Sequence, residues 1–283
     1  MSHSAARHDV DAELVNEFKG DIDNLVELKS DNNWGDIRSA DGNFISTTRE
    51  YSFGKRVVFE PIGDIKNLNL QSTRGIGIPD GCTVDDIVNN VNSSMAIEES
   101  DQVRIDEIEK ISQLLNNGNK PAPNMFLHGF CEIGFRIPKL MHFYSKNYDM
   151  HPFGYEYNPL NVKIAQKMGY EAIHMNLMDP TAVISAIGNA SLTVCYHVLE
   201  HVSRPQDVLK LIHDHMSVGS YLHIEVPIEP GIPRLEFGHL FPFDFRDLEH
   251  MGKAVGFRLI TLSNETHHGG PVIERYMMFK AGE

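Results

Sequence analysis

The sequence is poor in cysteine and has no long hydrophobic run. Its three cysteines, Cys82, Cys131 and Cys195, match neither a zinc-site spacing nor a CxxC motif. An odd number of isolated cysteines is typical of a reducing compartment. The first residues, MSHSAARHDVDAEL, lack the apolar core of a secretory signal, and no stretch approaches the ~20 apolar residues of a membrane span. We therefore expect a cytoplasmic protein outside the membrane.

Basic residues are also scarce, with 25 Lys and Arg against 39 Asp and Glu and a formal net charge of −14. Proteins that bind nucleic acid usually carry a cluster of basic residues, because neutralising the phosphates supplies most of their affinity. No cluster rich in Lys and Arg appears along the chain. The sequence thus disfavours a polynucleotide partner and favours a small-molecule acceptor.

The chain changes character near residue 119, which predicts two regions, 1–118 and 119–283. The first is polar and rich in Asn and Asp, and we expect it to be a small α+β region that covers an acceptor pocket or forms a homodimer interface. Its predicted elements are a helix over 9–29, a hairpin of strands 44–53 and 56–60, a helix from the N-cap Thr83 to Met95, and an amphipathic helix over 104–115. Residues 119–124, with two prolines, predict a stiff linker.

After the linker, strand and helix patterns alternate. The predicted strands are 125–133, 153–157, 172–175, 192–196, 221–226, 257–262 and 275–279, and the predicted helices are 138–144, 159–168, 181–187, 205–215 and 245–255. Such alternation predicts a parallel sheet with helices on both faces. The last two strands are too close for a crossover helix, so they must pair antiparallel. The expected fold is α/β: a Rossmann-like, mostly parallel seven-stranded sheet with an antiparallel last strand.

Polar side chains gather where the predicted strands end. Open α/β sheets bind ligands at the carboxyl ends of their strands. The first strand ends at Glu132, the second at Glu156, and Asp179 follows the third. The steps between them are 24 and 23 residues, and each step fits one strand-helix-strand unit. This regular spacing favours a cofactor site over unrelated solvated carboxylates.

The segment Val194–Val202, VCYHVLEHV, followed by Pro205, resembles the fourth motif of the small-molecule branches of the class I S-adenosylmethionine-dependent methyltransferase family. Residues 219–227, GSYLHIEVP, resemble the strand that follows it. His239, residues 243–248 and the pair Gly256-Phe257 resemble the "H…F…L…GF" tail of the family. The resemblance covers about residues 124–283 and implies an S-adenosylmethionine-dependent methyltransferase.

The resemblance assigns cofactor contacts to the strand ends. Glu132 and Gly134 would line the methionine part, and Glu156 would accept hydrogen bonds from the ribose hydroxyls, which one carboxylate meets well. Asn176 or Asp179 would face the adenine amino group, with the ring packed on Leu177. With the strand-end tyrosines, the predicted cofactor-binding residues are Glu132, Gly134, Glu156, Tyr157, Asn176, Leu177, Asp179 and Tyr196.

The first loop departs from the family pattern E/D-x-G-x-G-x-G. Arg136 and Pro138 stand where the second and third glycines are expected. Proline is acceptable in the first turn of the following helix, whereas Arg136 must point away from the cofactor or towards its carboxylate. A catalytically inactive methyltransferase-like partner protein is therefore an alternative.

His197, Glu200 and His201 are spaced i, i+3 and i+4, so on a helical turn they would share a face. With His239 they are similar to the metal site of small-RNA 2′-O-methyltransferases and ubiquinone-pathway O-methyltransferases, although His197 replaces the first glutamate. One reading is a divalent metal held by His197, Glu200, His201 and His239, which would lower the pKa of a substrate hydroxyl. Another is a metal-free site in which His201 or His197 removes the proton, with Glu200 as the third catalytic residue. A purely structural role is the third.

The leading hypothesis is a methyltransferase that acts on a small polar metabolite, with oxygen as the first expected acceptor atom and nitrogen as the second. A metal-dependent RNA 2′-O-methyltransferase is the alternative that a four-ligand metal site favours and the acidic charge disfavours.

Overall fold

The fold is that of a computed structural model of the 283-residue chain. The structure describes residues 97–116, 125–231, 239–266 and 271–282, and before them only 25–26, 37–38, 44–50, 57–61, 71–72, 83, 85–86 and 88–89. The predicted linker at 119–124, Cys82 and most of the predicted helix over 9–29 lie outside the described residues.

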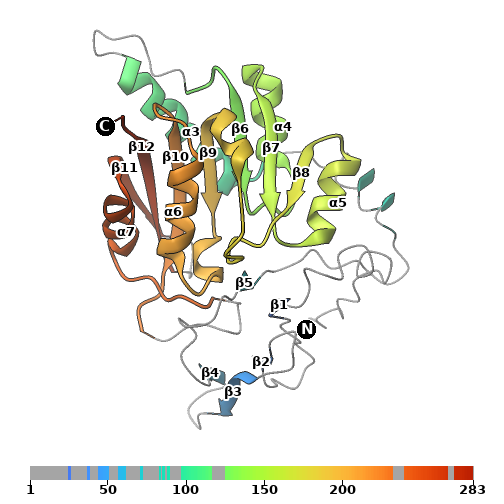
Figure 1. Cartoon of the computed structure of the whole chain (residues 1–283), viewed down its shortest axis with the longest axis vertical. Helices are drawn as coiled ribbons and strands as arrows, with labels where there is room; N and C mark the ends of the chain where they lie inside the picture. Colours follow the sequence, from blue (N-terminus) through green and yellow to red (C-terminus); the bar gives the residue numbers. More distant parts are fainter. Residues whose placement is uncertain are drawn as a thin grey trace.

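A seven-stranded sheet forms the centre of the molecule (Figure 1). In their order across the sheet, the strands are β11 (Phe257–Thr266), β12 (Val272–Lys280), β10 (Tyr221–Ile228), β9 (Ala190–Tyr196), β6 (Gly129–Ile133), β7 (His151–Glu156) and β8 (Glu171–His174). The strands from β10 to β8 pair in parallel, whereas β12 runs antiparallel to both β10 and β11. The prediction of a mostly parallel Rossmann-like sheet with an antiparallel last strand is confirmed.

Helices cover both faces of the sheet, as predicted. The first layer consists of α3 (Glu99–Asn116), α4 (Lys139–Tyr148) and α5 (Pro159–Lys167), and the second of α6 (Pro205–His215) and α7 (Asp247–Val255). Successive residues of a strand point to opposite faces, so Val194 of β9 joins the core under the first layer and Cys195 joins the core under the second. None of the helices in the described part of the chain is long and apolar enough to cross a bilayer.

Local signals explain where the helices start and stop. The side chain of Asn158 accepts the N–H of Leu160 at 2.9 Å, which caps α5, and Pro159 takes the first helical position. Helix α6 also has a proline, Pro205, at its first position, but its cap residue Arg204 makes no side-chain hydrogen bond to the helix. Helix α7 ends at Gly256, whose φ of 108° suits glycine at a helix end. These caps are short-range contacts, which is why the sequence predicts them well.

Two predicted helical segments are wrong in detail. The helix predicted over 181–187 is replaced by the 3₁₀ turn η3 (Ser185–Asn189), because Asp179 accepts both the N–H and the hydroxyl of Thr181 at 2.7 Å and turns the chain. The turn expected to carry the histidine run starts only at η4 (Leu199–His201). His197 lies before it with a left-handed φ of 54°, so it does not share the helical face assigned to it.

The described pieces of the first region follow the predictions in part. Strands β3 (Phe44–Glu50) and β4 (Val57–Pro61) pair antiparallel, which confirms the hairpin, and β2 (Ile37–Arg38) adds a third strand. Thr83 accepts the N–H of Asp86 at 3.2 Å, as predicted for an N-cap. The prediction of a helix over 9–29 is wrong at residues Leu25–Val26. They form strand β1, which pairs in parallel with β5 (Gln71–Ser72). Long-range strand pairing overrides helical periodicity there.

Candidate active site

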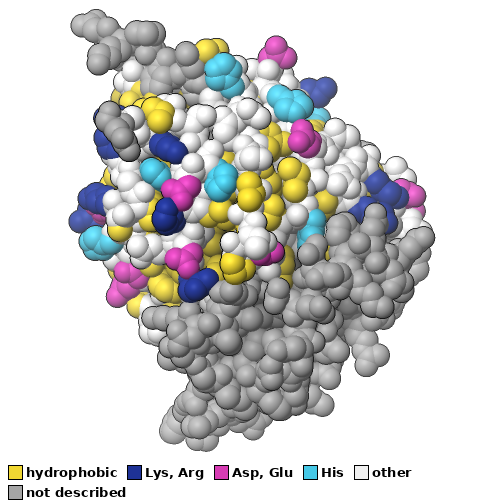
Figure 2. All heavy atoms as spheres, viewed as in Figure 1, with side chains coloured by type: hydrophobic (Ala, Val, Ile, Leu, Met, Phe, Trp, Pro, Cys, Tyr) yellow, Lys and Arg dark blue, Asp and Glu magenta, His cyan; other side chains and the backbone are white. Residues whose placement is uncertain are grey.

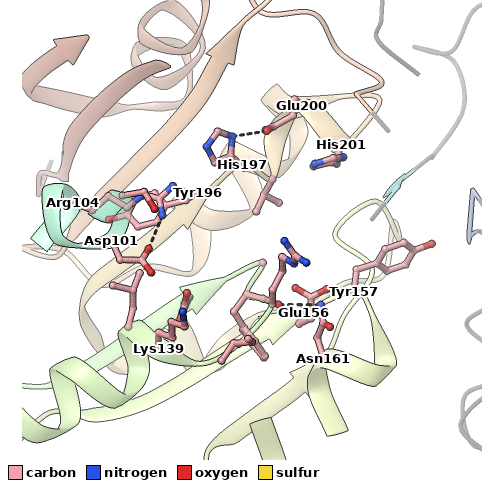
Figure 3. Close-up of a pocket in the computed structure, with 18 of the residues that line it drawn as sticks. Asp101, Arg104, Lys139, Glu156, Tyr157, Asn161, Tyr196, His197, Glu200 and His201 are labelled. Atoms are coloured by element: carbon pink, nitrogen blue, oxygen red, sulfur yellow. Dashed lines mark hydrogen bonds and ion pairs between the residues drawn. The ribbon is translucent and has the colours of Figure 1, made fainter. Parts of the chain in front are cut away.

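A cleft of about 540 Å³ opens at the carboxyl ends of the parallel strands. Its walls come from β5, α3, the loops after β6, β7 and β9, and His239. The predicted site residues that line it are Glu132, Gly134, Glu156, Tyr157, Tyr196, His197, Glu200, His201 and His239. Figure 3 shows how these loops face one another across the cleft. The position is the one expected for a ligand site in an open α/β sheet.

Glu156 is a buried carboxyl at the end of β7, only 5% exposed. Its Oε1 accepts the N–H of Asn158 at 2.6 Å. Burial raises the pKa of Glu156 to about 8, against the lowering effect of hydrogen bonds from Asn158 and Asn161. The backbone N–H groups of Tyr157 and Phe135 also donate to this carboxyl, and a pair of ligand hydroxyls would add donors that favour its ionised form.

Glu132 lies at the end of β6, one strand away, and is 8% exposed. Its Oε2 has no hydrogen-bond partner among the described residues. Burial, aided by the nearby charge of Asp101, raises the pKa of Glu132 to about 8. The cleft therefore holds a second buried carboxyl, and one of its two oxygens lacks a donor among the described residues.

Gly134 follows Glu132 in the loop after β6 and has a φ of 75°. A Cβ at this position would lie 2.2 Å from Cγ2 of Val198, which belongs to the loop after β9. Both observations require glycine, because a side chain would be strained and would collide. The close approach of these two loops forms the floor of the cleft.

Arg136 and Pro138 occupy the second and third glycine positions of the family pattern. Pro138 immediately precedes α4 and acts as its cap residue. Arg136 lines the cleft and is exposed. Its side chain is therefore free of the packed floor beneath Gly134.

His197 lies between two carboxylates at the end of β9. Its Nδ1 is 3.1 Å from Oε1 of Glu200, and its Nε2 is 3.1 Å from Oε1 of Glu225 on β10. Burial disfavours the charged ring, but the hydrogen bonds to Glu200 and Glu225 prevail and raise the pKa of His197 to about 9. At neutral pH the ring is protonated, so it donates hydrogen bonds and has no lone pair for a proton or a metal.

Three of the four predicted metal ligands come together. Glu200, His201 and His239 offer ligand atoms that all lie within 4.8 Å of one another. Glu229 binds Nδ1 of His239 at 2.6 Å and so orients that ring, and Oε2 of Glu200 has no partner among the described residues. The residue set suits an imidazole- and carboxylate-binding ion. His197 is not part of it, because both of its ring nitrogens face carboxylates.

The residues predicted for adenine do not line the cleft. Oδ1 of Asn176 accepts the N–H of Met178 at 2.9 Å. Asp179 is exposed and holds Thr181. Leu177 is buried, 6% exposed, and its N–H donates to Oε1 of Gln71 at 2.8 Å. This loop after β8 is thus closed by contacts of its own and by one from the distant strand β5.

Helix α3 contributes residues that the sequence patterns did not single out. The guanidinium of Arg104 lies over the ring of Tyr196, 4.5 Å from its centre, and pairs with Asp101 at 2.7 Å and with Glu225. On α4, Lys139 pairs with Glu98. Apolar periodicity marked α3 as a helix but could not show which strand its polar side would meet.

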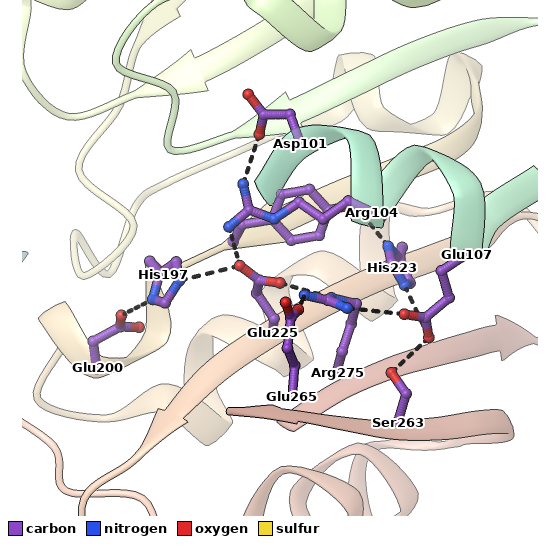
Figure 4. A network of polar contacts seen from close by, with 11 residues as sticks. Asp101, Arg104, Glu107, His197, Glu200, His223, Glu225, Ser263, Glu265 and Arg275 are labelled. Atoms are coloured by element: carbon purple, nitrogen blue, oxygen red, sulfur yellow. Dashed lines mark hydrogen bonds and ion pairs between the residues drawn. The ribbon is translucent and has the colours of Figure 1, made fainter. Parts of the chain in front are cut away.

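Glu225 is the centre of a buried polar network (Figure 4). It accepts hydrogen bonds from Arg104 and, at 2.8 Å, from Arg275 of β12, in addition to His197. Arg275 also reaches Glu107 of α3 at 3.0 Å. Although burial opposes it, these cationic partners hold the pKa of Glu225 well below its usual range. A charged residue in an otherwise apolar strand is the sequence signal that could have revealed this network.

Comparisons with known proteins extend these observations. No protein-family model and no curated protein matches the sequence. Among solved structures, a putative sarcosine dimethylglycine methyltransferase from Galdieria sulphuraria superposes with a TM-score of 0.50 at 9% identity, over 64% of this chain and 87% of that one. A SAM-dependent methyltransferase from Archaeoglobus fulgidus gives a TM-score of 0.43 at 15% identity, over 61% and 94%, and the cyclase SpnF gives 0.46 at 12%, over 62% and 81%. The sheet topology and the likeness to the first of these structures show the Rossmann-like fold found in S-adenosylmethionine-dependent methyltransferases.

Proposed function

We propose that the protein transfers a methyl group from S-adenosylmethionine to a small polar acceptor. The observation that carries the proposal is Glu156, a buried carboxyl at the end of the strand next to β6. One carboxylate can accept hydrogen bonds from both ribose hydroxyls of the cofactor. Gly134, with the close-packed floor beneath it, leaves room for the ligand above the loop after β6.

The methionine end of the cofactor would lie over β6. Glu132 and Asp101 line the same cleft, and their carboxyl groups suit an ammonium group. Arg136 is exposed on the same cleft and suits the carboxylate. The departure from the glycine pattern would then supply a cofactor contact.

When bound, S-adenosylmethionine supplies an electrophilic methyl group on a sulfonium. Most of the rate should come from holding the acceptor in line with that group. His201 and His239, beside Glu200, lie on the β9 side of the cleft. His201 would take the proton of an acceptor hydroxyl, since an imidazole suits that task near neutral pH. His197, whose two ring nitrogens are held by Glu200 and Glu225, would position Glu200 and would not donate to the acceptor. We place oxygen first and nitrogen second as the acceptor atom.

The first region, 1–118, would complete the acceptor pocket. Its helix α3 brings Arg104 to the cleft, whereas Gln71 of β5 lines the cleft beside the loop after β8. We assign the second region, 119–283, to cofactor binding. A homodimer interface in the first region is the other role consistent with its sequence.

One specific observation favours a metal-dependent reaction, including RNA 2′-O-methylation: the cluster of Glu200, His201 and His239. A bound divalent ion there would polarise the acceptor hydroxyl. The net charge of −14 opposes a polynucleotide substrate. On the face drawn in Figure 2, Lys and Arg side chains are scattered among Asp, Glu and His, and no basic patch is visible among the residues coloured there. We therefore rank this function second.

Titration calorimetry with S-adenosylhomocysteine tests the proposal first. Binding supports an enzyme, and absence of binding at high micromolar concentration would leave only the inactive methyltransferase-like protein. Transfer of labelled methyl groups to panels of small alcohols, phenols and amines then tests the acceptor class. Labelling confined to RNA, and lost in EDTA, would favour the metal-dependent alternative.

A further inference from the structure

Gln71 comes from strand β5, far from the sheet in sequence, yet it lies at the carboxyl ends of the parallel strands (Figure 1). It forms an isolated antiparallel bridge with Val202, the residue after η4. Its side chain is 5% exposed and lines the candidate active site. Buried polar side chains nearly always form hydrogen bonds, so the partner of Gln71 indicates its role.

The buried side chain of Gln71 has a hydrogen-bond partner of clear geometry. Its Oε1 accepts the N–H of Leu177 at 2.8 Å. Because an N–H can only donate, the accepting atom must be the carbonyl oxygen, and this sets the orientation of the carboxamide. Leu177 lies in the loop after β8, the neighbour of β7 that ends in Glu156.

Other polar groups of this loop are bonded within it. Asn176 accepts the N–H of Met178, and Asp179 holds Thr181. The N–H of Leu177 differs from them, because its partner comes from another region of the chain. A ligand that extends from Glu156 towards β8 would meet this N–H and would need to present an acceptor to it.

We propose that the carboxamide of Gln71 occupies the place of the cofactor's adenine base and competes with it. A carboxamide presents a carbonyl acceptor beside an NH₂ donor, and adenine presents a ring-nitrogen acceptor beside its exocyclic NH₂ donor. The two edges therefore offer the same pattern to the Leu177 N–H. This inference rests on the proposed function, since it takes the ribose to lie at Glu156.

The competition has a measurable consequence. The cofactor binds the fraction of molecules in which Gln71 has left Leu177, so its apparent affinity is reduced by that fraction. One neutral hydrogen bond separates the two states, and we expect its removal to tighten cofactor binding about three- to tenfold.

Three variants test the proposal by titration with S-adenosylhomocysteine. Gln71→Ala removes the competitor and should bind about three- to tenfold more tightly than wild type. Gln71→Glu keeps an acceptor for the Leu177 N–H and should bind no more tightly than wild type. Gln166→Ala is the matched control, because Gln166 also bonds a backbone group, the carbonyl of Ala172 at 2.8 Å, but does not line the cleft. It should leave the affinity unchanged.

Fragments of the ligand separate the base from the rest. Adenosine should show the same gain in Gln71→Ala, and homocysteine, which lacks the base, should show none. Amide hydrogen exchange supplies a readout without ligand: the Leu177 N–H should be protected in wild type, lose protection in Gln71→Ala, and regain it when adenosine binds.

Unchanged or weaker binding of S-adenosylhomocysteine by folded Gln71→Ala would overturn the competition, and so would a Leu177 N–H that keeps its protection in that variant. Absence of binding by wild type and by every variant is a different failure, because it removes the proposed function and this inference with it.

Discussion

The guanidinium of Arg104 on α3 lies 4.5 Å from the centre of the Tyr196 ring at the end of β9. The same guanidinium reaches Asp101 and the buried carboxylate of Glu225. This contact joins a helix of the first region to the carboxyl end of the sheet. One wall of the candidate active site therefore depends on residues that precede the sheet in the sequence.

Removal of Arg104 should destabilise the protein strongly. Arg104→Ala leaves Glu225 buried with one cationic partner fewer, and we expect a loss of about 3–5 kcal/mol in the free energy of unfolding, measured with urea. Arg104→Lys keeps the charge but loses the planar fork and its stacking on Tyr196, so its loss should be smaller. Lys210→Ala is the control, because the Lys210–Asp214 pair is 64% and 48% exposed and should cost less than about 1 kcal/mol. Equal losses in Arg104→Ala and Lys210→Ala would contradict the buried network.

The loop after β6 should tolerate no side chain at Gly134. Gly134→Ala adds a Cβ 2.2 Å from Val198 at a φ of 75°, so we expect lower melting temperature and loss of S-adenosylhomocysteine binding. Gly219→Ala is a matched control, since its φ is 89° but nothing lies within 4 Å of the added Cβ. It should show only the backbone strain of about 1 kcal/mol. If both variants melt alike and bind alike, the close approach of Gly134 and Val198 is of no importance.

Glu156 should determine cofactor affinity. Glu156→Gln keeps the size of the side chain but weakens its hydrogen bonds to hydroxyl donors, and we expect S-adenosylhomocysteine to bind about 10- to 100-fold more weakly in calorimetry. Glu171→Gln, on the exposed start of β8, is the control and should bind as wild type does. A wild-type affinity in Glu156→Gln would remove the main support for the proposed function.

The ligand-free protein should become less stable as the pH rises. Glu132 and Glu156 have pKa values raised to about 8, and His197 to about 9. Above their unfolded pKa values and below the folded ones, the folded state holds more protons than the unfolded state, so stability falls with increasing pH. We expect the melting temperature to fall between about pH 5 and about pH 9.

The variant Glu132→Gln/Glu156→Gln tests the cause of that fall. Neither amide titrates, so the pH dependence should flatten over the same range. It should retain the part that belongs to His197 and the opposite part that belongs to His213 and His223, whose pKa values burial lowers. An unchanged slope in this variant would show that the two carboxyl groups are not buried in their protonated form.

Methyl transfer should survive EDTA if His201 is the base. His201→Ala should lower kcat about 10²- to 10⁴-fold, while His250→Ala, an exposed histidine of α7, should leave it unchanged. Loss of activity in EDTA, restored by a divalent ion, would instead favour metal binding by Glu200, His201 and His239. The His239→Ala variant then separates the two cases further. If His239 is a metal ligand, the added divalent ion should no longer restore activity in this variant.

The sequence alone determined the sheet and its order of elements. Alternating apolar patterns, proline at helix starts and glycine at helix ends act over a few residues, so they predict β6 to β12 and the helices α4 to α7, although not the 3₁₀ turn η3. The regular steps from Glu132 to Glu156 placed both carboxyl groups at strand ends, and the structure brings them to one cleft. The antiparallel last strand followed from a connection too short for a helix.

The tertiary structure decided which side chains meet there. Gln71 and Arg104 belong to two separate elements, and no local pattern could show that they line the same cleft or that Arg104 meets Glu225 on β10. His197 does not join the other three predicted metal ligands, because two buried carboxylates, one of them on β10, hold its ring. In the loop after β8, Asn176 and Asp179 accept hydrogen bonds from Met178 and Thr181 of the same loop. Such outcomes depend on contacts between distant segments and on burial, which sets the charge of each group, whereas periodicity reports only which face of an element is apolar.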